Sequence, residues 1–138
     1  MLPINFLSII VAAIVAFVVG FLMHGPVAGK LWMRLANIVP TGNEKFSDMV
    51  PQMLWNLLAN VVTATVLSVV YLFASHSVYL GAVGLMGGVI CALWLWVFGV
   101  AGSSMDVIWM GKSGKLWLFE CFSSLLVMVS MGAVIAAW

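Results

Sequence analysis

Hydrophobic and polar positions along this chain fall into long blocks. Charged residues are absent from three tracts, Met1–Met23, Met49–Met105 and Cys121–Trp138. Because an α-helix needs about 20 mostly apolar residues to cross a bilayer, these tracts have room for one, two and one spans respectively. We expect the four spans at about residues 4–23, 53–73, 80–101 and 116–137.

Short polar or helix-breaking segments separate these spans. His24-Gly25-Pro26 follows the first span, Ala74-Ser75-His76-Ser77 reads as a tight turn after the second, and Gly111-Lys112-Ser113-Gly114 precedes the fourth. Tight connections join antiparallel neighbours. The predicted fold class is therefore an all-α membrane protein, a single domain over residues 1–138 with four transmembrane helices in an up-down bundle.

A short interfacial helix is predicted after the first span, at about residues 27–39. Lys30, Arg34 and Asn37 recur there at i, i+4 and i+7, which places them on one helical face. Aliphatic residues occupy the opposite face, a pattern typical of a helix that lies in the membrane surface.

Composition excludes several classes of protein. The chain is 65% hydrophobic and 7% charged, whereas a soluble domain carries roughly 25% charged residues. Disorder, nucleic-acid binding and an ordinary soluble enzyme are all disfavoured, and the expected partner is a lipid bilayer.

The five Lys and Arg residues all fall in the first and third connections. Since basic residues accumulate in cytoplasmic loops, these two connections are predicted to be cytoplasmic. Four spans then place both termini of this multi-pass protein outside the cytoplasmic membrane.

Small residues recur at every fourth position on two of the predicted helices. Such rows let helix backbones approach closely in lipid. The spacing does not decide whether the resulting seam lies within one chain or between chains. The expected seam residues are Ala12, Ala16, Gly20, Gly84, Gly88 and Ala92.

Polar residues are expected to gather in the cytoplasmic half of the bundle. Asn56, Asn60 and Thr63 stand at i, i+4 and i+7, and amides inside a membrane must find hydrogen-bond partners. They would either join helices or line a polar cavity. With the predicted orientation, the cluster in the inner half comprises His24, Asn56, Asn60, Asp106 and Glu120.

Glu120 is the most unusual member of this cluster, because an ionisable residue in a transmembrane helix indicates a functional site with a partner. His24 is the expected partner, with Asp106 or Lys115 as others. The carboxylate would share a proton with the imidazole, help bind a divalent metal, or cap its helix beside interfacial water.

Enzymatic activity is not expected from the residues present. Cys91 and Cys121 are isolated, and no Gly-x-Ser-x-Gly nucleophile motif occurs. No spacing of ligands supports a metal, so we expect no catalytic residues, no metal site and no cofactor.

A short repeat links two of the connections. Gly29-Lys30-Leu31-Trp32 recurs as Gly114-Lys115-Leu116-Trp117. This is either the trace of a duplicated hairpin or a coincidence in a biased composition.

Motifs near both ends of the chain carry a family resemblance. They include Asn5-Phe6, Gly25-Pro26, Gly29-Lys30-Leu31-Trp32-Met33, Asp106-Val107-Ile108-Trp109 and Lys115-Leu116-Trp117-Leu118. Together they resemble a bacterial family called domain of unknown function 1761. The resemblance implies a four-helix integral membrane protein of the bacterial cytoplasmic (inner) membrane with no assigned activity. It also implies that Asp106 helps to pin the inner loops together.

Two functions are consistent with these patterns. The first is a structural or accessory protein that self-associates, or docks on a larger membrane complex, through its glycine-rich third span. The alternative is binding or permeation of a small solute or ion through a polar cavity in the cytoplasmic half. The two differ in whether Glu120 and Asn60 face a pocket or satisfy each other in a dry seam.

Overall fold

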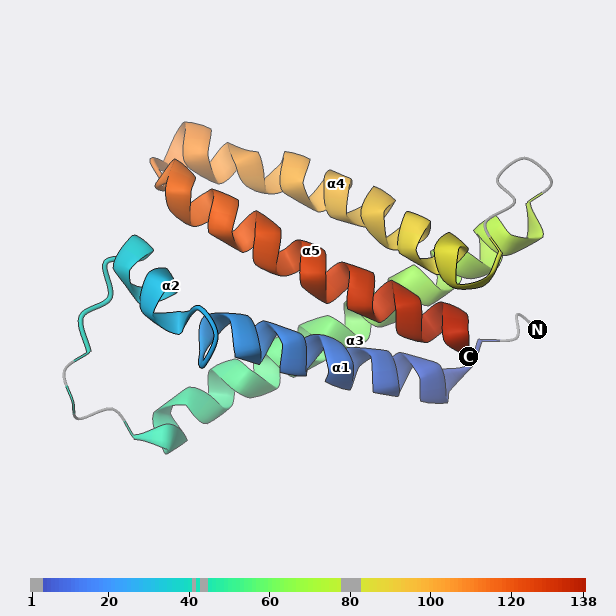
Figure 1. The fold of residues 1–138 in the computed structure, drawn as a ribbon, viewed down its shortest axis with the longest axis horizontal. Helices are drawn as coiled ribbons and strands as arrows, with labels where there is room; N and C mark the ends of the chain where they lie inside the picture. Colours follow the sequence, from blue (N-terminus) through green and yellow to red (C-terminus); the bar gives the residue numbers. More distant parts are fainter. Residues whose placement is uncertain (1–3, 41, 43–44, 78–82) are drawn as a thin grey trace.

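The computed structural model describes residues 4–40, 42, 45–77 and 83–138. Within these ranges the chain forms helices and no strands (Figure 1). The helices are α1 (Phe6–His24), α2 (Gly29–Leu35), α3 (Phe46–His76), α4 (Gly84–Met110) and α5 (Gly114–Ala137). Of these, α1, α3, α4 and α5 are long and apolar enough to cross a membrane. The predicted all-α membrane fold with four spans and a short helix after the first is confirmed.

The second membrane helix, α3, extends beyond its predicted span in both directions. At its start, the backbone N–H of Lys45 donates to Oδ2 of Asp48 at 3.4 Å, which caps the first turn. At its end, Ser75 Oγ donates to the Leu72 carbonyl at 3.0 Å, and His76 Nδ1 lies 2.8 Å from the same oxygen. The expected tight turn at 74–77 is therefore wrong for residues 74–76, because these side chains complete a last helical turn.

Residues with positive φ lie at or just after the C-terminal ends of α2 and α4. Helix α2 is shorter than predicted because Asn37, two residues after its end, has φ 55°, which an α-helix does not allow. Helix α4 continues to Met110, where Gly111 with φ 68° ends it. Residues 80–82 of the third predicted span lie outside the described residues.

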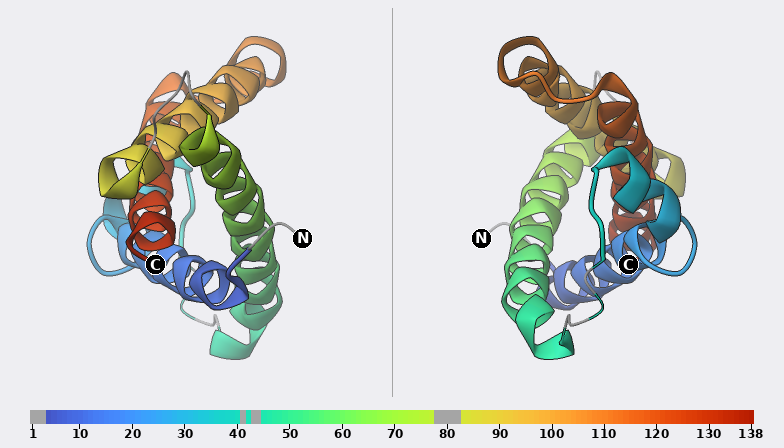
Figure 2. Two further views of the ribbon diagram at one scale, coloured as in Figure 1. Left: turned by 90° about the vertical axis from the view of Figure 1, so that its right-hand side faces the viewer. Right: turned by 90° about the vertical axis from the view of Figure 1, so that its left-hand side faces the viewer.

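The four long helices form a closed ring. Helix α4 packs along α5, α5 along α1, α1 against α3, and α3 against α4 (Figure 2). The start of α1 and the end of α5 lie at one end of the bundle, the terminal end (Figure 1). The other end, the basic end, holds α2, the start of α3 and the α4–α5 connection, with Lys30, Arg34, Lys45, Lys112 and Lys115.

The core is concentrated toward the terminal end. Ala12, Ala16, Ala64, Leu67 and Met131 have no exposed surface. Before Ala64, by contrast, α3 contains no buried residue. The bundle is therefore close-packed in its terminal half and opens toward the basic end.

The backbones of α4 and α5 approach each other closely at two glycines. A Cβ atom built on Gly88 would lie 2.3 Å from the carbonyl oxygen of Gly132, and one built on Gly132 would lie 2.8 Å from the Cβ of Ala92. The glycine seam of α4 is thus used inside the chain. Gly84 does not take part, since it has φ 64° at the helix start and a Cβ there would meet nothing within 4 Å.

The seam residues of α1 also face the interior. Ala12 and Ala16 are fully buried, and a Cβ on Gly20 would lie 3.7 Å from Cγ2 of Val127 in α5. Ala12 and Ala16 therefore belong to the core, whereas the space beside Gly20 would also accept a methyl group.

Candidate functional site

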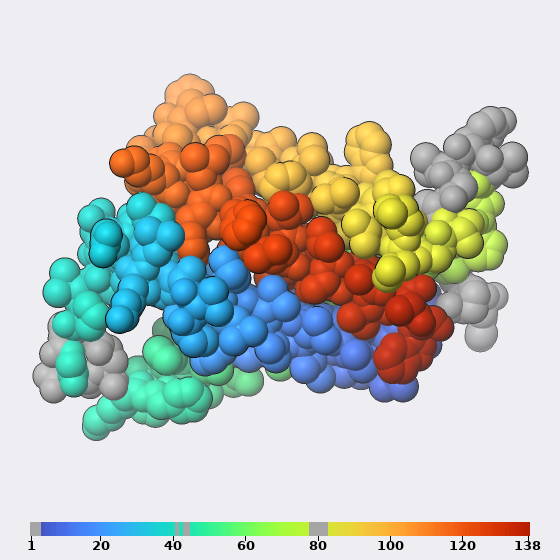
Figure 3. All heavy atoms as spheres, in the orientation of Figure 1, coloured from blue at the N-terminus to red at the C-terminus, as the bar shows by residue number. Residues whose placement is uncertain are grey.

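A cavity of about 760 Å³ lies in the basic half, between α1, α3 and α5. In the space-filling view a hollow is visible between the blue atoms of α1 and α2 and the orange atoms at the start of α5 (Figure 3). The cavity wall combines apolar and polar side chains. Its polar residues are His24, Gln52, Asn56, Asn60, Glu120, Ser123 and Ser124, and its larger apolar residues are Phe17, Phe21, Trp32, Met49, Met53 and Val127.

The structure brings four of the five residues of the predicted polar cluster to this cavity. His24, Asn56, Asn60 and Glu120 all line it. Asp106 does not, because α4 contributes no residue to the wall. Its backbone carbonyl instead accepts the N–H of Lys112 at 3.2 Å, which holds the α4–α5 connection.

The two asparagines of α3 form a pair along their own helix. Nδ2 of Asn60 donates to Oδ1 of Asn56 at 3.0 Å, and Thr63 Oγ1 donates to the Ala59 carbonyl at 2.9 Å. This row therefore does not join two helices. Among the described residues, Asn56 Nδ2 and Asn60 Oδ1 make no hydrogen bond, and both residues line the cavity.

His24 is held in a defined orientation by three neighbours. Its Nδ1 lies 3.0 Å from the Gly20 carbonyl oxygen, and because a carbonyl only accepts, Nδ1 carries the proton. The ring also meets Trp32 and Phe119 edge-on, with centroids 5.4 and 5.7 Å apart. Nε2 is then the remaining polar atom of the ring.

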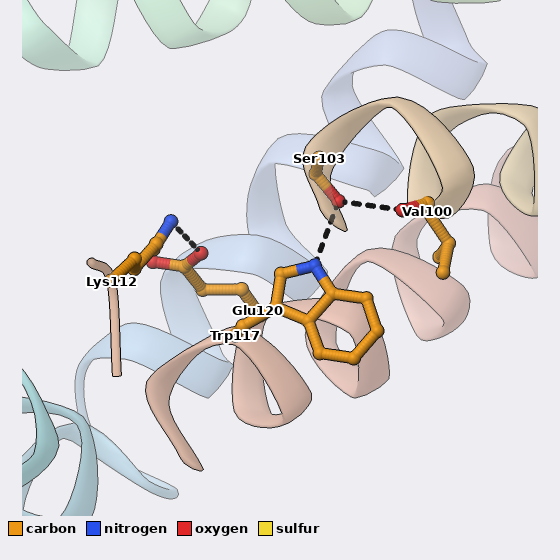
Figure 4. Close-up of polar contacts among 5 residues, drawn as sticks. All are labelled: Val100, Ser103, Lys112, Trp117 and Glu120. Atoms are coloured by element: carbon orange, nitrogen blue, oxygen red, sulfur yellow. Dashed lines mark hydrogen bonds and ion pairs between the residues drawn. The ribbon is translucent and has the colours of Figure 1, made fainter. Parts of the chain in front are cut away.

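Glu120 pairs with Lys112, and the expected pairing with His24 is wrong (Figure 4). Gly111 in its left-handed conformation turns the chain after α4, so that the Lys112 side chain reaches back to α5. The side chains of Lys112 and Glu120 are 26% and 36% exposed, so other molecules can reach this ion pair. Within the described part of the chain Oε1 of Glu120 makes no hydrogen bond.

Two tryptophans connect α4 and α5 in opposite directions. Trp96 Nε1 donates to the Cys121 carbonyl at 3.0 Å and lies 3.2 Å from Ser124 Oγ, while Trp117 Nε1 donates to Ser103 Oγ at 3.0 Å (Figure 4). An indole N–H in a membrane needs such a partner, and that requirement is the signal in the sequence that points to these bonds. They fix the helix that carries Glu120.

The wall contains residues that the sequence analysis did not place in the polar cluster. Trp32 enters from α2 and Gln52 from the first turns of α3, a region predicted to precede the second span. Only the observed length of α3 places Gln52 beside the predicted cluster.

The chemistry available here is hydrogen bonding and charge pairing around an apolar volume. Among the described residues, no group of three His, Cys, Asp or Glu side chains is arranged to hold a metal ion. The cavity instead offers one carboxylate, amide groups and a ring nitrogen beside aromatic rings.

Comparisons with known proteins identify a family and no individual relative. Neither the curated proteins nor the solved structures contain a match to the chain. A family model described as "protein of unknown function (DUF1761)" matches residues 7–136, which is nearly the whole chain. The chain therefore belongs to the DUF1761 family, as the residues at its two ends indicated.

Proposed function

We propose that this membrane protein binds a small amphipathic molecule in the cavity of its basic half. The observation that carries the proposal is the convergence of His24, Asn56, Asn60 and Glu120 on one volume of about 760 Å³. Ligand pockets are typically about 300–1,000 Å³ and combine a mostly apolar wall with a few placed polar groups. This wall has that composition.

Binding is favoured over permeation by the packing of the other half. Ala64, Leu67 and Met131 fill the terminal half and expose no surface. A molecule that enters from the basic end therefore meets a closed wall, which suits a binding pocket better than a pore.

Self-association, or docking on a larger complex, stays a separate prediction. This prediction rests on the glycine row of α4, and the contact of Gly88 with Gly132 gives that row a packing role within one chain. The mass of the protein in a mild detergent tests it, since a purely monomeric particle would contradict self-association. Assignment to the bacterial inner membrane, with both termini outside, is likewise proposed from the family and the basic loops.

Extraction from native membranes, followed by mass spectrometry of bound small molecules, tests the binding proposal. The variant Asn56→Leu/Asn60→Leu removes the two asparagine amides from the wall and leaves Gln52 in place. The matched control is Thr65→Leu, since Thr65 is exposed on the same helix and bonds to its own Val61 carbonyl at 2.8 Å.

We expect the wild type and Thr65→Leu to retain one small molecule and the double variant to lose it. Extraction of the wild type without any bound molecule would contradict the proposal. Retention of the same molecule by the double variant would contradict it as well.

A further inference from the structure

Resting on the proposed binding function, we infer that the ligand is an organic monocation with an apolar body. We further infer that its cationic group takes the carboxylate of Glu120 from Lys112.

The charge of the wall points to a cation. Among the described residues that line the cavity, Glu120 alone carries a formal charge, and Lys112 lies outside the wall. Oε1 of Glu120 and Oδ1 of Asn60 are both left as acceptors by the hydrogen bonds described above. A ligand anion would face the carboxylate without a compensating cation in the wall.

The apolar part of the wall points the same way. Phe17, Phe21 and Trp32 line the same cavity as the polar groups, and the faces of aromatic rings attract cations while accommodating apolar groups. A hydrophobic cation would therefore satisfy the carboxylate and the rings at once.

Lys112 is suited to be displaced. It follows Gly111 in the short α4–α5 connection, and both members of its pair are partly exposed. A carboxylate within a membrane helix is costly and is usually paired, and in the empty site Lys112 is the partner that neutralises Glu120. When a ligand cation replaces the ammonium, Glu120 keeps a partner and Lys112 returns to water at the basic end.

Binding of three related probes to the full chain in phosphatidylcholine nanodiscs tests this inference. The probes are tetraphenylphosphonium as the cation, tetraphenylborate as an anion of the same shape, and triphenylphosphine oxide as a neutral molecule. Equilibrium dialysis measures their affinities, and empty nanodiscs supply the background from the lipid.

We expect saturable binding of tetraphenylphosphonium alone. Glu120→Gln should weaken it by about tenfold or more, and Lys112→Gln should strengthen it several-fold because the competing ammonium is gone. Lys115→Gln is the matched control, since Lys115 is exposed and forms no ion pair among the described residues. Its affinity should equal that of the wild type.

Several outcomes would overturn the inference. One is that triphenylphosphine oxide or tetraphenylborate binds as tightly as the cation, and another is that Lys112→Gln behaves like Lys115→Gln. This second comparison still decides the matter if Glu120→Gln fails to fold. The loss of the bound molecule in Asn56→Leu/Asn60→Leu tests the binding function itself. If that molecule proved to be neutral, the binding function would stand and only the inference of a cationic ligand would be refuted.

Discussion

The contact between α4 and α5 at Gly88 gives a stability prediction that can be worked out from the structure. In Gly88→Ala, the new methyl group would lie 2.3 Å from the Gly132 carbonyl oxygen and 2.4 Å from the Ala136 Cβ. The first of these atoms belongs to a helix backbone and cannot rotate away. The two helices must separate locally, which also loosens the packing of Ala92.

Two opposing terms set the size of the effect. Forcing an extra methyl group into a packed contact costs about 1–3 kcal/mol. Replacing glycine by alanine inside a helix returns up to about 1 kcal/mol through helix propensity. We therefore expect Gly88→Ala to lower the free energy of unfolding by about 1–2 kcal/mol, and Gly132→Ala, with its Cβ 2.5 Å from the Gly88 carbonyl oxygen, to act similarly.

Gly99→Ala is the matched control on the same helix. A Cβ at Gly99 would meet nothing within 4 Å, so only the propensity term remains and the variant should be unchanged or slightly stabilised. Reversible unfolding in mixed micelles of dodecyl sulfate and a mild detergent, followed by circular dichroism, measures all three variants against the wild type.

Equal stability of Gly88→Ala and Gly99→Ala would refute this reasoning, because it would mean that α4 and α5 do not touch at Gly88. If Gly88→Ala instead left stability unchanged and reduced the particle mass in detergent, the seam would lie between chains. The same variants therefore separate the two locations that the sequence left open.

Three further outcomes follow from the geometry. Trp96→Phe removes the indole donor between α4 and α5 and should lower the free energy of unfolding by about 1 kcal/mol. Trp94 is 71% exposed, so Trp94→Phe should lower it little. Equal losses of stability would contradict a role for the Trp96 hydrogen bond. His24→Leu should reduce retention of the bound molecule, while His76→Leu, which removes a similar bond to its own helix, should not; equal retention would exclude His24 from the site. A reporter that is active only in the cytoplasm should be inactive when fused to the C-terminus, and activity there would reverse the predicted orientation.

The fold could be predicted from the sequence because the distribution of charged residues determines which long segments can enter a bilayer as helices. The long charge-free tracts fix which segments can enter a bilayer, and the confirmed four helices follow from them. The spacing of Asn56 and Asn60 fixes their common face whatever the neighbours do. An up-down topology then places the two asparagines in the same half of the bundle as His24 and Glu120.

Local backbone conformation explains what the sequence did not predict. The partner of Glu120 depends on the left-handed turn at Gly111, which returns Lys112 to α5. Gly84 and Gly88 share one row in the sequence, yet the positive φ of Gly84 places it at the helix start rather than in the seam. The periodicity of residues along a helix predicts neither the partner of Glu120 nor the position of Gly84.

Lys112 has two roles, and experiments can separate them. It is one of the basic residues that predict the orientation of the chain, and it neutralises Glu120 at the cavity. In Lys112→Gln, four basic residues remain at the basic end, so the C-terminal reporter should give the same signal as in the wild type. An increase in cation affinity without a change in orientation would then come from the release of the carboxylate, because the membrane arrangement of the helices is unaltered.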